Sequence, residues 1–326
     1  MSEGRIFVYP IKLKSIYKDY IWGGSKLKES WNKDSGFKRV AESWELSCCD
    51  DGLSLVENGI FKNKNLKDVL LLFPEWVAEN LKGSANFPLL VKLIDAKEKL
   101  SIQVHPSDEF ADKSKGQQGK TEAWYILDCE KDAFLYVGLK ENLTEDQIRE
   151  YVIDGTICEH LNKVFVKPGD LFFISAGTIH AIGAGILIVE IQQNSNTTFR
   201  LFDYDRVDSS GKKRELHLEE ALRVCDKTAF SIQNSEIKNR VQKEYATITS
   251  LVDSKFFRVF EYDVKSAVSI TTTKRSFQAL LFIDGIASIT YGGQKHEAKK
   301  GDCYFIPAGM GKYEVEGMGK FLLSEV

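Results

Sequence analysis

The stretch Lys167-Pro-Gly-Asp-Leu-Phe-Phe-Ile-Ser-Ala-Gly-Thr-Ile-His180 decides how the rest of the chain is interpreted, because the chain contains it twice. The second copy, which aligns without a gap, runs Lys299-Lys-Gly-Asp-Cys-Tyr-Phe-Ile-Pro-Ala-Gly-Met-Gly-Lys312. Each copy is typical of a turn, a strand, a second turn and then a residue that points inward. An internal repeat of this kind predicts two similar β-domains. The pattern G-D-x-x-F-I suits a turn followed by a strand in any protein. The repeat is therefore evidence about the fold and not about activity.

The two copies differ at their last position, where the first has His180 and the second has Lys312. A metal site needs a neutral imidazole at such a position, whereas an ammonium group repels the cation. We therefore expect the first copy alone to hold a metal in this way.

Two predicted strands upstream of the repeat also carry polar side chains that could bind a metal. Leu100–His105 is typical of a strand that Pro106 ends, with Gln103 and His105 on one face. Thr121–Leu127 is typical of the next long strand and places Glu122, Trp124 and Ile126 on one face. An amide oxygen, an imidazole and a carboxylate are ligands for a divalent metal of the zinc type. Taken alone, these two segments are more typical of an ordinary strand histidine beside a surface glutamate.

Composition limits the class of protein. The chain has 326 residues, 43% of them hydrophobic, which is enough for a sizeable core and for more than one domain. A formal net charge of −3 gives no overall attraction to nucleic acid or to an anionic membrane, so we expect neither as a partner. The six cysteines form no C-x-x-C pair, the first 14 residues contain no apolar signal segment, and no apolar run is long enough to span a membrane. We therefore expect reduced thiols and a cytoplasmic location.

Few helices are expected. Helical patterns occur over Leu66–Leu72 and Glu75–Leu81, and Leu216–Val224 carries the last such pattern in the chain. A capping-box pattern at Thr144 predicts a further helix that runs to about Asp154. Only strand and turn patterns follow, so the sequence predicts a mainly β fold.

The motifs resemble those of a known family. Gly169-x5-Ser175-x-Gly177-x-x-His180 resembles the second cupin motif, with serine where proline is usual, and Gln103-x-His105 with the later Glu122 resembles the first, with glutamine in place of its first histidine. Together with Gln-x-His-Pro, Gly-Lys-Thr-Glu-x-Trp-Tyr and Gln-Asn-Ser-x-x-Thr-x-Arg, they resemble the type I mannose-6-phosphate isomerases in their short bacterial form. The resemblance runs from about residue 20 to residue 206 and is looser beyond.

The resemblance implies a fold and a cofactor. It implies two cupin-type jelly-roll barrels, with the helices attached to the first. Residues 1–240 would form a metal-binding catalytic cupin domain with helical insertions, and residues 241–326 a cupin-like domain without a metal site. It also implies one Zn²⁺ per chain, with the ligands Gln103, His105, Glu122 and His180.

Two cations are implied as catalytic residues, Arg200 and Lys120. Arg200 can meet either an oxyanion or the phosphate in a planar, bidentate way. Lys120 is a candidate for proton transfer or for charge stabilisation, and the sequence does not choose between the two. Without the resemblance, Lys120 is simply a surface turn lysine, and Arg200 simply a salt-bridge partner of Asp203 or Asp205.

One residue departs from the family pattern, because Asn196 stands where the family has an aspartate and an asparagine cannot act as a carboxylate base. Three hypotheses follow: an isomerase that interconverts mannose 6-phosphate and fructose 6-phosphate through an enediol, a non-catalytic cupin that senses a sugar or sugar phosphate, and a metal-dependent isomerase of another phosphosugar. A small phosphosugar is the expected partner, and the sequence leaves the oligomeric state open.

Overall fold

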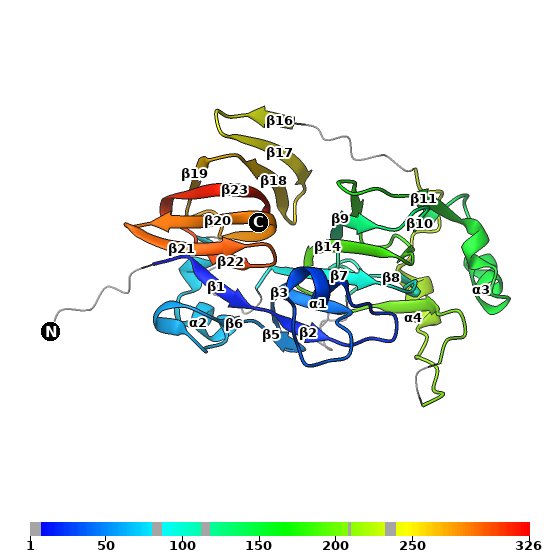
Figure 1. Ribbon diagram of the computed structural model, residues 1–326. Helices are drawn as coiled ribbons and strands as arrows, with labels where there is room; N and C mark the ends of the chain where they lie inside the picture. The colour runs from blue at the N-terminus through cyan, green and yellow to red at the C-terminus, as the bar shows by residue number, and fades with distance from the viewer. Residues whose placement is uncertain (1–7, 80–86, 112–117, 208–209, 232–238) are drawn as a thin grey trace. The chain divides into compact units, whose positions relative to one another are not determined.

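The computed structural model describes residues 8–79, 87–111, 118–207, 210–231 and 239–326. These residues form mainly β-structure with a few short helices, which confirms the expected fold class (Figure 1). They divide into two compact units. The unit built from the middle of the sequence, here called the central unit, comprises Tyr17–Ser43 and Leu90–Glu236. The unit that contains both ends of the sequence, here called the outer unit, comprises Met1–Ile16, Trp44–Leu89 and Ile237–Val326. The division expected at residue 240 falls close to the end of the central unit, and it stays a prediction about the folding domains.

The central unit is a sandwich of two antiparallel sheets (Figure 1). The six-stranded sheet has the order β12 (Leu171–Ile174), β9 (Glu122–Cys129), β14 (Ile186–Gln193), β7 (Leu89–Ala96), β3 (Glu42–Leu46) and β2 (Ile16–Lys18). The five-stranded sheet has the order β11 (Leu161–Phe165), β10 (Phe134–Leu139), β13 (His180–Ile182), β8 (Ile102–Val104) and β15 (Phe199–Phe202). One buried cluster contains Trp124 and Ile188 of the first sheet together with Val137 and Ile182 of the second. The two sheets therefore share a core, as in a jelly roll.

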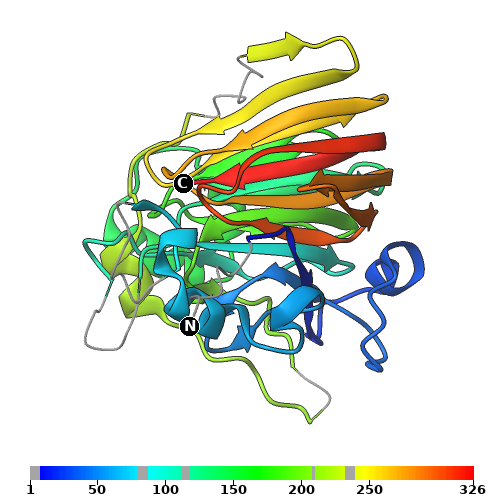
Figure 2. The ribbon, with the colours of Figure 1, turned by 90° about the vertical axis from the view of Figure 1, so that its left-hand side faces the viewer.

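The outer unit is built on a ten-stranded sheet, most of which comes from the C-terminal part of the chain (Figure 2). Its main path is β16 (Asn239–Gln242), β17 (Ala246–Asp253), β18 (Arg258–Val264), β23 (Gly311–Glu325), β20 (Gln278–Tyr291), β22 (Cys303–Ile306), β1 (Ile11–Lys14) and β6 (Leu55–Val56). Strand β19 (Ala267–Thr272) pairs with β23, β21 (Gln294–Lys299) pairs with β20, and β4 (Cys48–Cys49) forms a hairpin with β5 (Gly52–Leu53). Buried aromatic residues such as Tyr304, Tyr313 and Phe321 fill its core.

The helices largely match the sequence patterns. Helix α2 (Leu66–Leu72) has the predicted bounds, and α4 (Leu218–Val224) starts two residues later than predicted. Helix α3 (Glu145–Ile153) begins at Thr144 with both bonds of the predicted capping box. A short helix α1 (Lys26–Trp31) was not expected.

The helix predicted over Glu75–Leu81 is wrong in its described part, because a 3-10 turn over Pro74–Trp76 stands there; residues 80 and 81 lie outside the described residues. Two further 3-10 turns cover Gly59–Phe61 and Ile157–His160. None of the described helices has the length and apolar character that a membrane span requires.

The sequence repeat has the same local structure in both copies. The carboxylate of Asp170 accepts a hydrogen bond from the Lys167 amide at 2.9 Å, and that of Asp302 accepts one from the Lys299 amide at 3.0 Å. The glycines before these aspartates have φ of +90° and +91°, a region that side chains disfavour. The strand that follows is β12 in the first copy and β22 in the second. The repeat therefore predicted a real structural correspondence.

Candidate active site

Three strands of the central unit bring the expected metal ligands together. His180 opens β13 and stands directly opposite Gln103 of β8, His105 follows β8, and Glu122 opens β9. The ligand atoms of His105, Glu122 and His180 lie within 4.8 Å of one another, and all three residues are buried. Gln103 Nε2 lies 3.4 Å from His180 Nε2. The four residues that the motifs suggested thus converge on one place.

Both histidines are held in the same tautomer. Nδ1 of His105 donates to the carbonyl oxygen of Thr197 at 2.9 Å, and Nδ1 of His180 donates to that of Thr178 at 2.8 Å. A carbonyl oxygen only accepts, so Nδ1 carries the proton and Nε2 keeps its lone pair. Burial lowers the pKa of His105 well below its usual value and that of His180 to about 4. Two neutral imidazoles therefore direct Nε2 lone pairs at Glu122 from 3.5 and 3.3 Å.

The Glu122 carboxylate and the Nε2 atoms of the two histidines form a cluster of acceptors that a cation would stabilise. Its Oε1 is buried and no donor among the described residues satisfies it, while its Oε2 lies 2.9 Å from Lys120 Nζ. Burial raises the pKa of the Glu122 carboxyl, since charge without compensation is disfavoured there. Two Nε2 lone pairs and this carboxylate make a donor set that suits a divalent ion of the zinc type. Gln103 turns its amide nitrogen toward His180 and its oxygen toward Ser101, so it would offer its oxygen to a metal after a flip of the amide. The residues present therefore fit the implied metal.

Lys120 is not the surface turn lysine of the alternative interpretation. Its side chain is 5% exposed, and its Nζ lies 3.1 Å from His105 Nε2. Its backbone amide is bonded to the Pro106 carbonyl at 3.0 Å, which fixes the turn that leads into β9. Its Nζ also lies 3.7 Å from Oε1 of Glu190, a residue in β14. Lys120 therefore stands between two buried carboxylates.

Sequence reasoning missed a second buried ion pair, between Lys92 of β7 and Glu190. Their Nζ and Oε1 atoms are 3.2 Å apart, and Trp124 Nε1 donates to Glu190 Oε2 at 3.0 Å. Burial opposes both charges, but Lys120 and Lys92 nevertheless hold the pKa of Glu190 well below its usual value. Glu42, whose carboxylate lies 3.8 Å from Lys92, and Glu190 together keep the pKa of Lys92 high against the effect of burial. The available signal was a charged residue within a mainly apolar run of each strand, Lys92 in β7 and Glu190 in β14.

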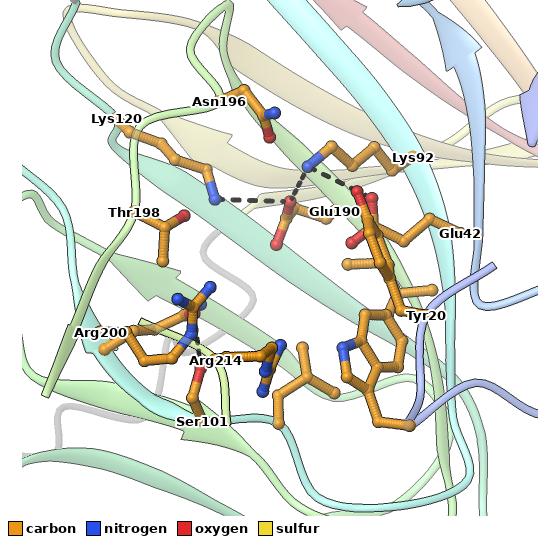
Figure 3. A pocket seen from close by; sticks show the side chains of 14 residues that line it. Tyr20, Glu42, Lys92, Ser101, Lys120, Glu190, Asn196, Thr198, Arg200 and Arg214 are labelled. Atoms are coloured by element: carbon orange, nitrogen blue, oxygen red, sulfur yellow. Dashed lines mark hydrogen bonds and ion pairs between the residues drawn. The ribbon is translucent and has the colours of Figure 1, made fainter. Parts of the chain in front are cut away.

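A cavity of about 230 Å³ adjoins this group and shares Gln103 and Lys120 with the metal-ligand cluster (Figure 3). It is lined by Tyr20, Trp22, Glu42, Lys92, Ile94, Leu100, Ser101, Gln103, Lys120, Glu190, Asn196, Thr198, Arg200 and Arg214. Four cationic and two carboxylate side chains make its wall positive. Its small volume suits a small, polar and anionic ligand.

Arg200 reaches this cavity from β15, where it stands opposite Gln103. Its Nη1 donates to the Glu215 carbonyl at 2.8 Å, while its buried Nε has no partner in the described part of the chain. The alternative role as a salt-bridge partner is not seen: Asp203 pairs with Arg206 and Arg214 instead. Burial, and then the Arg214 charge, lower the pKa of Arg200.

The second copy of the repeat presents no such cluster. Lys312 is 68% exposed and lies 3.8 Å from Glu314. Within the described ranges, the group around Glu122 is the one set of three histidine, cysteine or acidic side chains placed to bind a metal.

Comparisons with known proteins point to one family. The sequence pattern of the phosphomannose isomerase type I catalytic domain matches residues 11–135, and that of the mannose-6-phosphate isomerase cupin domain matches residues 247–326. Among curated proteins, the mannose-6-phosphate isomerase ManA of Bacillus subtilis is 37% identical over 97% of this chain and 99% of its own length. The mannose-6-phosphate isomerase of Streptococcus mutans is 33% identical over 94% of this chain and 95% of its own.

Solved structures show the same relationship. The crystal structure of the mannose 6-phosphate isomerase from Bacillus subtilis superposes with a TM-score of 0.89 at 32% identity, covering 97% of this chain and 99% of that one. A phosphomannose isomerase from Salmonella typhimurium has the same fold, with a TM-score of 0.75 at 18% identity over 97% of this chain and 98% of that one. With its mainly β fold and its buried metal-ligand cluster, the chain belongs to the type I mannose-6-phosphate isomerase family of cupin proteins.

Proposed function

We propose that this protein interconverts mannose 6-phosphate and fructose 6-phosphate through an enediol, with one zinc ion per chain. The observation that carries the proposal is the cluster of two neutral imidazoles and an unsatisfied buried carboxylate beside a small cationic cavity. Aldose–ketose isomerisation moves a proton between adjacent carbons and develops negative charge on their oxygens. It therefore needs a Lewis acid, a group that exchanges the proton, and cations that face the developing charge.

Gln103, His105, Glu122 and His180 would hold the zinc ion. When bound, zinc supplies Lewis acidity toward the oxygens of the substrate. The backbone carbonyls of Thr197 and Thr178 accept hydrogen bonds from the two imidazoles and so fix their orientation and tautomer. Metal-bound histidines commonly have such a partner. With Glu122 and His105 holding a metal, the lone pairs that face Lys120 would be engaged, and Glu190 would remain as the carboxylate neighbour of that ammonium group.

Lys120 and Glu190 are the groups we assign to proton exchange. Both line the cavity, and their Nζ and Oε1 atoms are 3.7 Å apart. Glu190 is kept ionised by the two lysines beside it, so it offers the carboxylate that Asn196 cannot provide. Arg200, which faces the same cavity with an unpartnered Nε, is placed to meet the negative charge of the enediolate.

We further propose that the enzyme acts in the cytoplasm on a free phosphosugar, with no nucleic acid or membrane partner. The six cysteines are all free, as expected in a reducing compartment. The cavity is lined by a few converging polar groups, which suits a single small ligand.

A coupled assay that measures fructose 6-phosphate formed from mannose 6-phosphate tests the proposal directly. We expect turnover by the zinc-loaded protein, loss of turnover after chelation, and recovery when zinc is added back. Free mannose and glucose 6-phosphate serve as control substrates. Calorimetric binding of mannose 6-phosphate without turnover would favour the non-catalytic sensor, for which the substitution at Asn196 is the specific argument. Turnover in protein that elemental analysis shows to be free of metal would contradict the zinc assignment.

A further inference from the structure

The backbone on both sides of Lys120 is held by two side chains from other parts of the central unit. The Gly119 amide donates to Asp108 Oδ1 at 2.9 Å. The Thr121 amide donates to Gln193 Oε1, also at 2.9 Å. The two side chains bind each other as well, because Gln193 Nε2 donates to Asp108 Oδ2 at 3.1 Å. Asp108 and Gln193 therefore form one connected pair, here called the clasp, that binds the residues before and after Lys120.

The hydrogen bonds of the clasp fit only one arrangement of its groups. The amide oxygen of Gln193 accepts a backbone N–H, so the amide nitrogen must face Asp108. The two oxygens of the Asp108 carboxylate accept one bond each. Gly119 lies so close that a Cβ added to it would stand 2.5 Å from the Asp108 amide nitrogen. The two backbone segments therefore lie directly against each other, and a glycine is needed at the contact.

The clasp acts on Lys120 rather than on the metal ligand that follows it. Glu122 opens β9 and is paired on both sides, with Ile174 of β12 and with Gln192 of β14. The sheet therefore holds Glu122 independently of the clasp. Lys120 precedes the strand, yet its Nζ must lie between two carboxylates, 2.9 Å from Glu122 and 3.7 Å from Glu190 (Figure 3). Its position depends on the backbone that the clasp binds.

We propose that Asp108 and Gln193 are positioning residues that hold Lys120 in place for proton exchange. This inference rests on the proposed function for the role of Lys120. Neither residue lines the cavity, so both act through Lys120 and not on the substrate. Proton transfer requires its partners at hydrogen-bond distance, and a misplacement of about 1 Å can lower a rate on the order of 100-fold.

Exchanging the two side-chain functions tests the inference. In Asp108→Asn the introduced amide nitrogen faces that of Gln193, and in Gln193→Glu two carboxylates face each other, so each single variant breaks the bond within the clasp. The double variant Asp108→Asn/Gln193→Glu reverses donor and acceptor in this bond and keeps an oxygen for each backbone amide. We expect each single variant to lower kcat for mannose 6-phosphate by about 10- to 100-fold, with little change in KM or bound zinc. The double variant should recover most of the lost kcat.

Glu109→Gln is the matched control. Glu109 follows Asp108 in the same turn, is exposed, and makes no hydrogen bond or ion pair with any other residue that the structure describes. Its substitution removes the same charge as Asp108→Asn but leaves the clasp intact. We therefore expect Glu109→Gln to keep the wild-type kcat, and an equal loss in both variants would mean that charge, and not the clasp, is responsible.

Hydrogen exchange provides a readout that does not depend on turnover. Peptides that span residues 119–121, followed by mass spectrometry, should exchange faster in each single variant and at nearly the wild-type rate in the double variant. If this order is seen but the wild type turns over no mannose 6-phosphate, the proposed function fails and the positioning of Lys120 by the clasp stands.

Two other results would overturn the clasp while the isomerase activity stands. One is a wild-type kcat in both single variants, or a double variant no more active than they are. The other is single variants that lose zinc, melt well below the wild type and exchange faster throughout the chain, because these changes mark a general structural role.

Discussion

The role of Arg200 follows from what its guanidinium does and does not contact. Its Nη1 donates to the Glu215 carbonyl, and its buried Nε meets no partner among the residues that the structure describes. Arg200→Lys should therefore keep the fold and the metal but lower kcat on the order of 10²-fold, because a point-charge ammonium cannot reproduce the planar fork. Steady-state kinetics and a melting curve on this one variant provide the measurement.

Other outcomes for Arg200→Lys would assign other roles. A raised KM with an unchanged kcat would mean that Arg200 grips the phosphate in the ground and transition states alike. A lower melting temperature with normal turnover would mean a structural role, which the pairing of Asp203 with Arg206 and Arg214 argues against. Wild-type kinetics and stability together would remove Arg200 from the catalytic group.

Lys92 allows a prediction about stability instead. It is buried, 3.2 Å from Glu190 and 3.8 Å from Glu42. Lys92→Met removes the cation that Glu42 and Glu190 share and leaves Lys120 as the remaining cation beside Glu190 within the described residues, so we expect a loss of roughly 3–5 kcal/mol in the free energy of unfolding. The double variant Lys92→Met/Glu190→Gln should recover part of this loss, because it also removes one of the two buried carboxylates that lost Lys92. Urea unfolding of both variants measures the effect, and a double variant no more stable than Lys92→Met would argue against the pairing.

At the level of elements, the sequence predicted which side chains share a face but not which strands are neighbours. Alternation correctly grouped Gln103 with His105, and the repeat correctly placed His180 at the start of its strand. Lys92 in β7 and Glu190 in β14 stand within apolar runs, and periodicity within one strand does not reveal which charge lies on the strand beside it. Glu190 and Lys92 are explained only by the sheet order, in which β14 and β7 are adjacent.

Loop residues were the least predictable part of the site. Arg214 lies 14 positions after Arg200 in the chain, in a segment without periodicity, and lines the cavity while Asp203 accepts its hydrogen bonds. Asn196 and Thr198 line the cavity from the segment before β15, for which no pattern predicted an orientation. The positions of such residues depend on specific tertiary hydrogen bonds, which cannot be predicted from the local sequence.

The turn before β12 gives a prediction at this scale. Gly169 has a φ of +90°, and a Cβ added there would meet no atom within 4 Å. The cost of Gly169→Ala is therefore backbone strain alone, and we expect a loss of about 1–2 kcal/mol in the free energy of unfolding. Gly169→Asn should cost less, because asparagine tolerates positive φ better. Denaturant midpoints of the two variants compare these costs, and an unchanged midpoint for Gly169→Ala would show that the turn relaxes freely.

For the whole chain, the repeat and the resemblance predicted two β-units and a single metal site, whereas the grouping of distant segments was not predictable. Strands β1 and β6 come from the N-terminal part of the chain but pair in the same sheet as β22. The short, weakly alternating sequence of β1 carries no signal for β22, a partner almost 300 residues away. Long-range strand pairing of this kind is decided by shape and burial in the finished sheet.

The two copies of the repeat allow an internal comparison, because His180 of the first copy and Lys312 of the second occupy equivalent positions in one chain. His180 presents a neutral Nε2 to Glu122, whereas Lys312 is largely exposed beside Glu314. His180→Ala should lose zinc and activity together, and Lys312→Ala should keep both. Zinc should also raise the unfolding free energy of the wild type and of Lys312→Ala, by about 2.7 kcal/mol at a free concentration 100 times the dissociation constant, but should stabilise His180→Ala far less. Elemental analysis and melting curves with and without zinc give readouts independent of turnover. Loss of zinc from Lys312→Ala would show that the metal site had been assigned to the wrong copy.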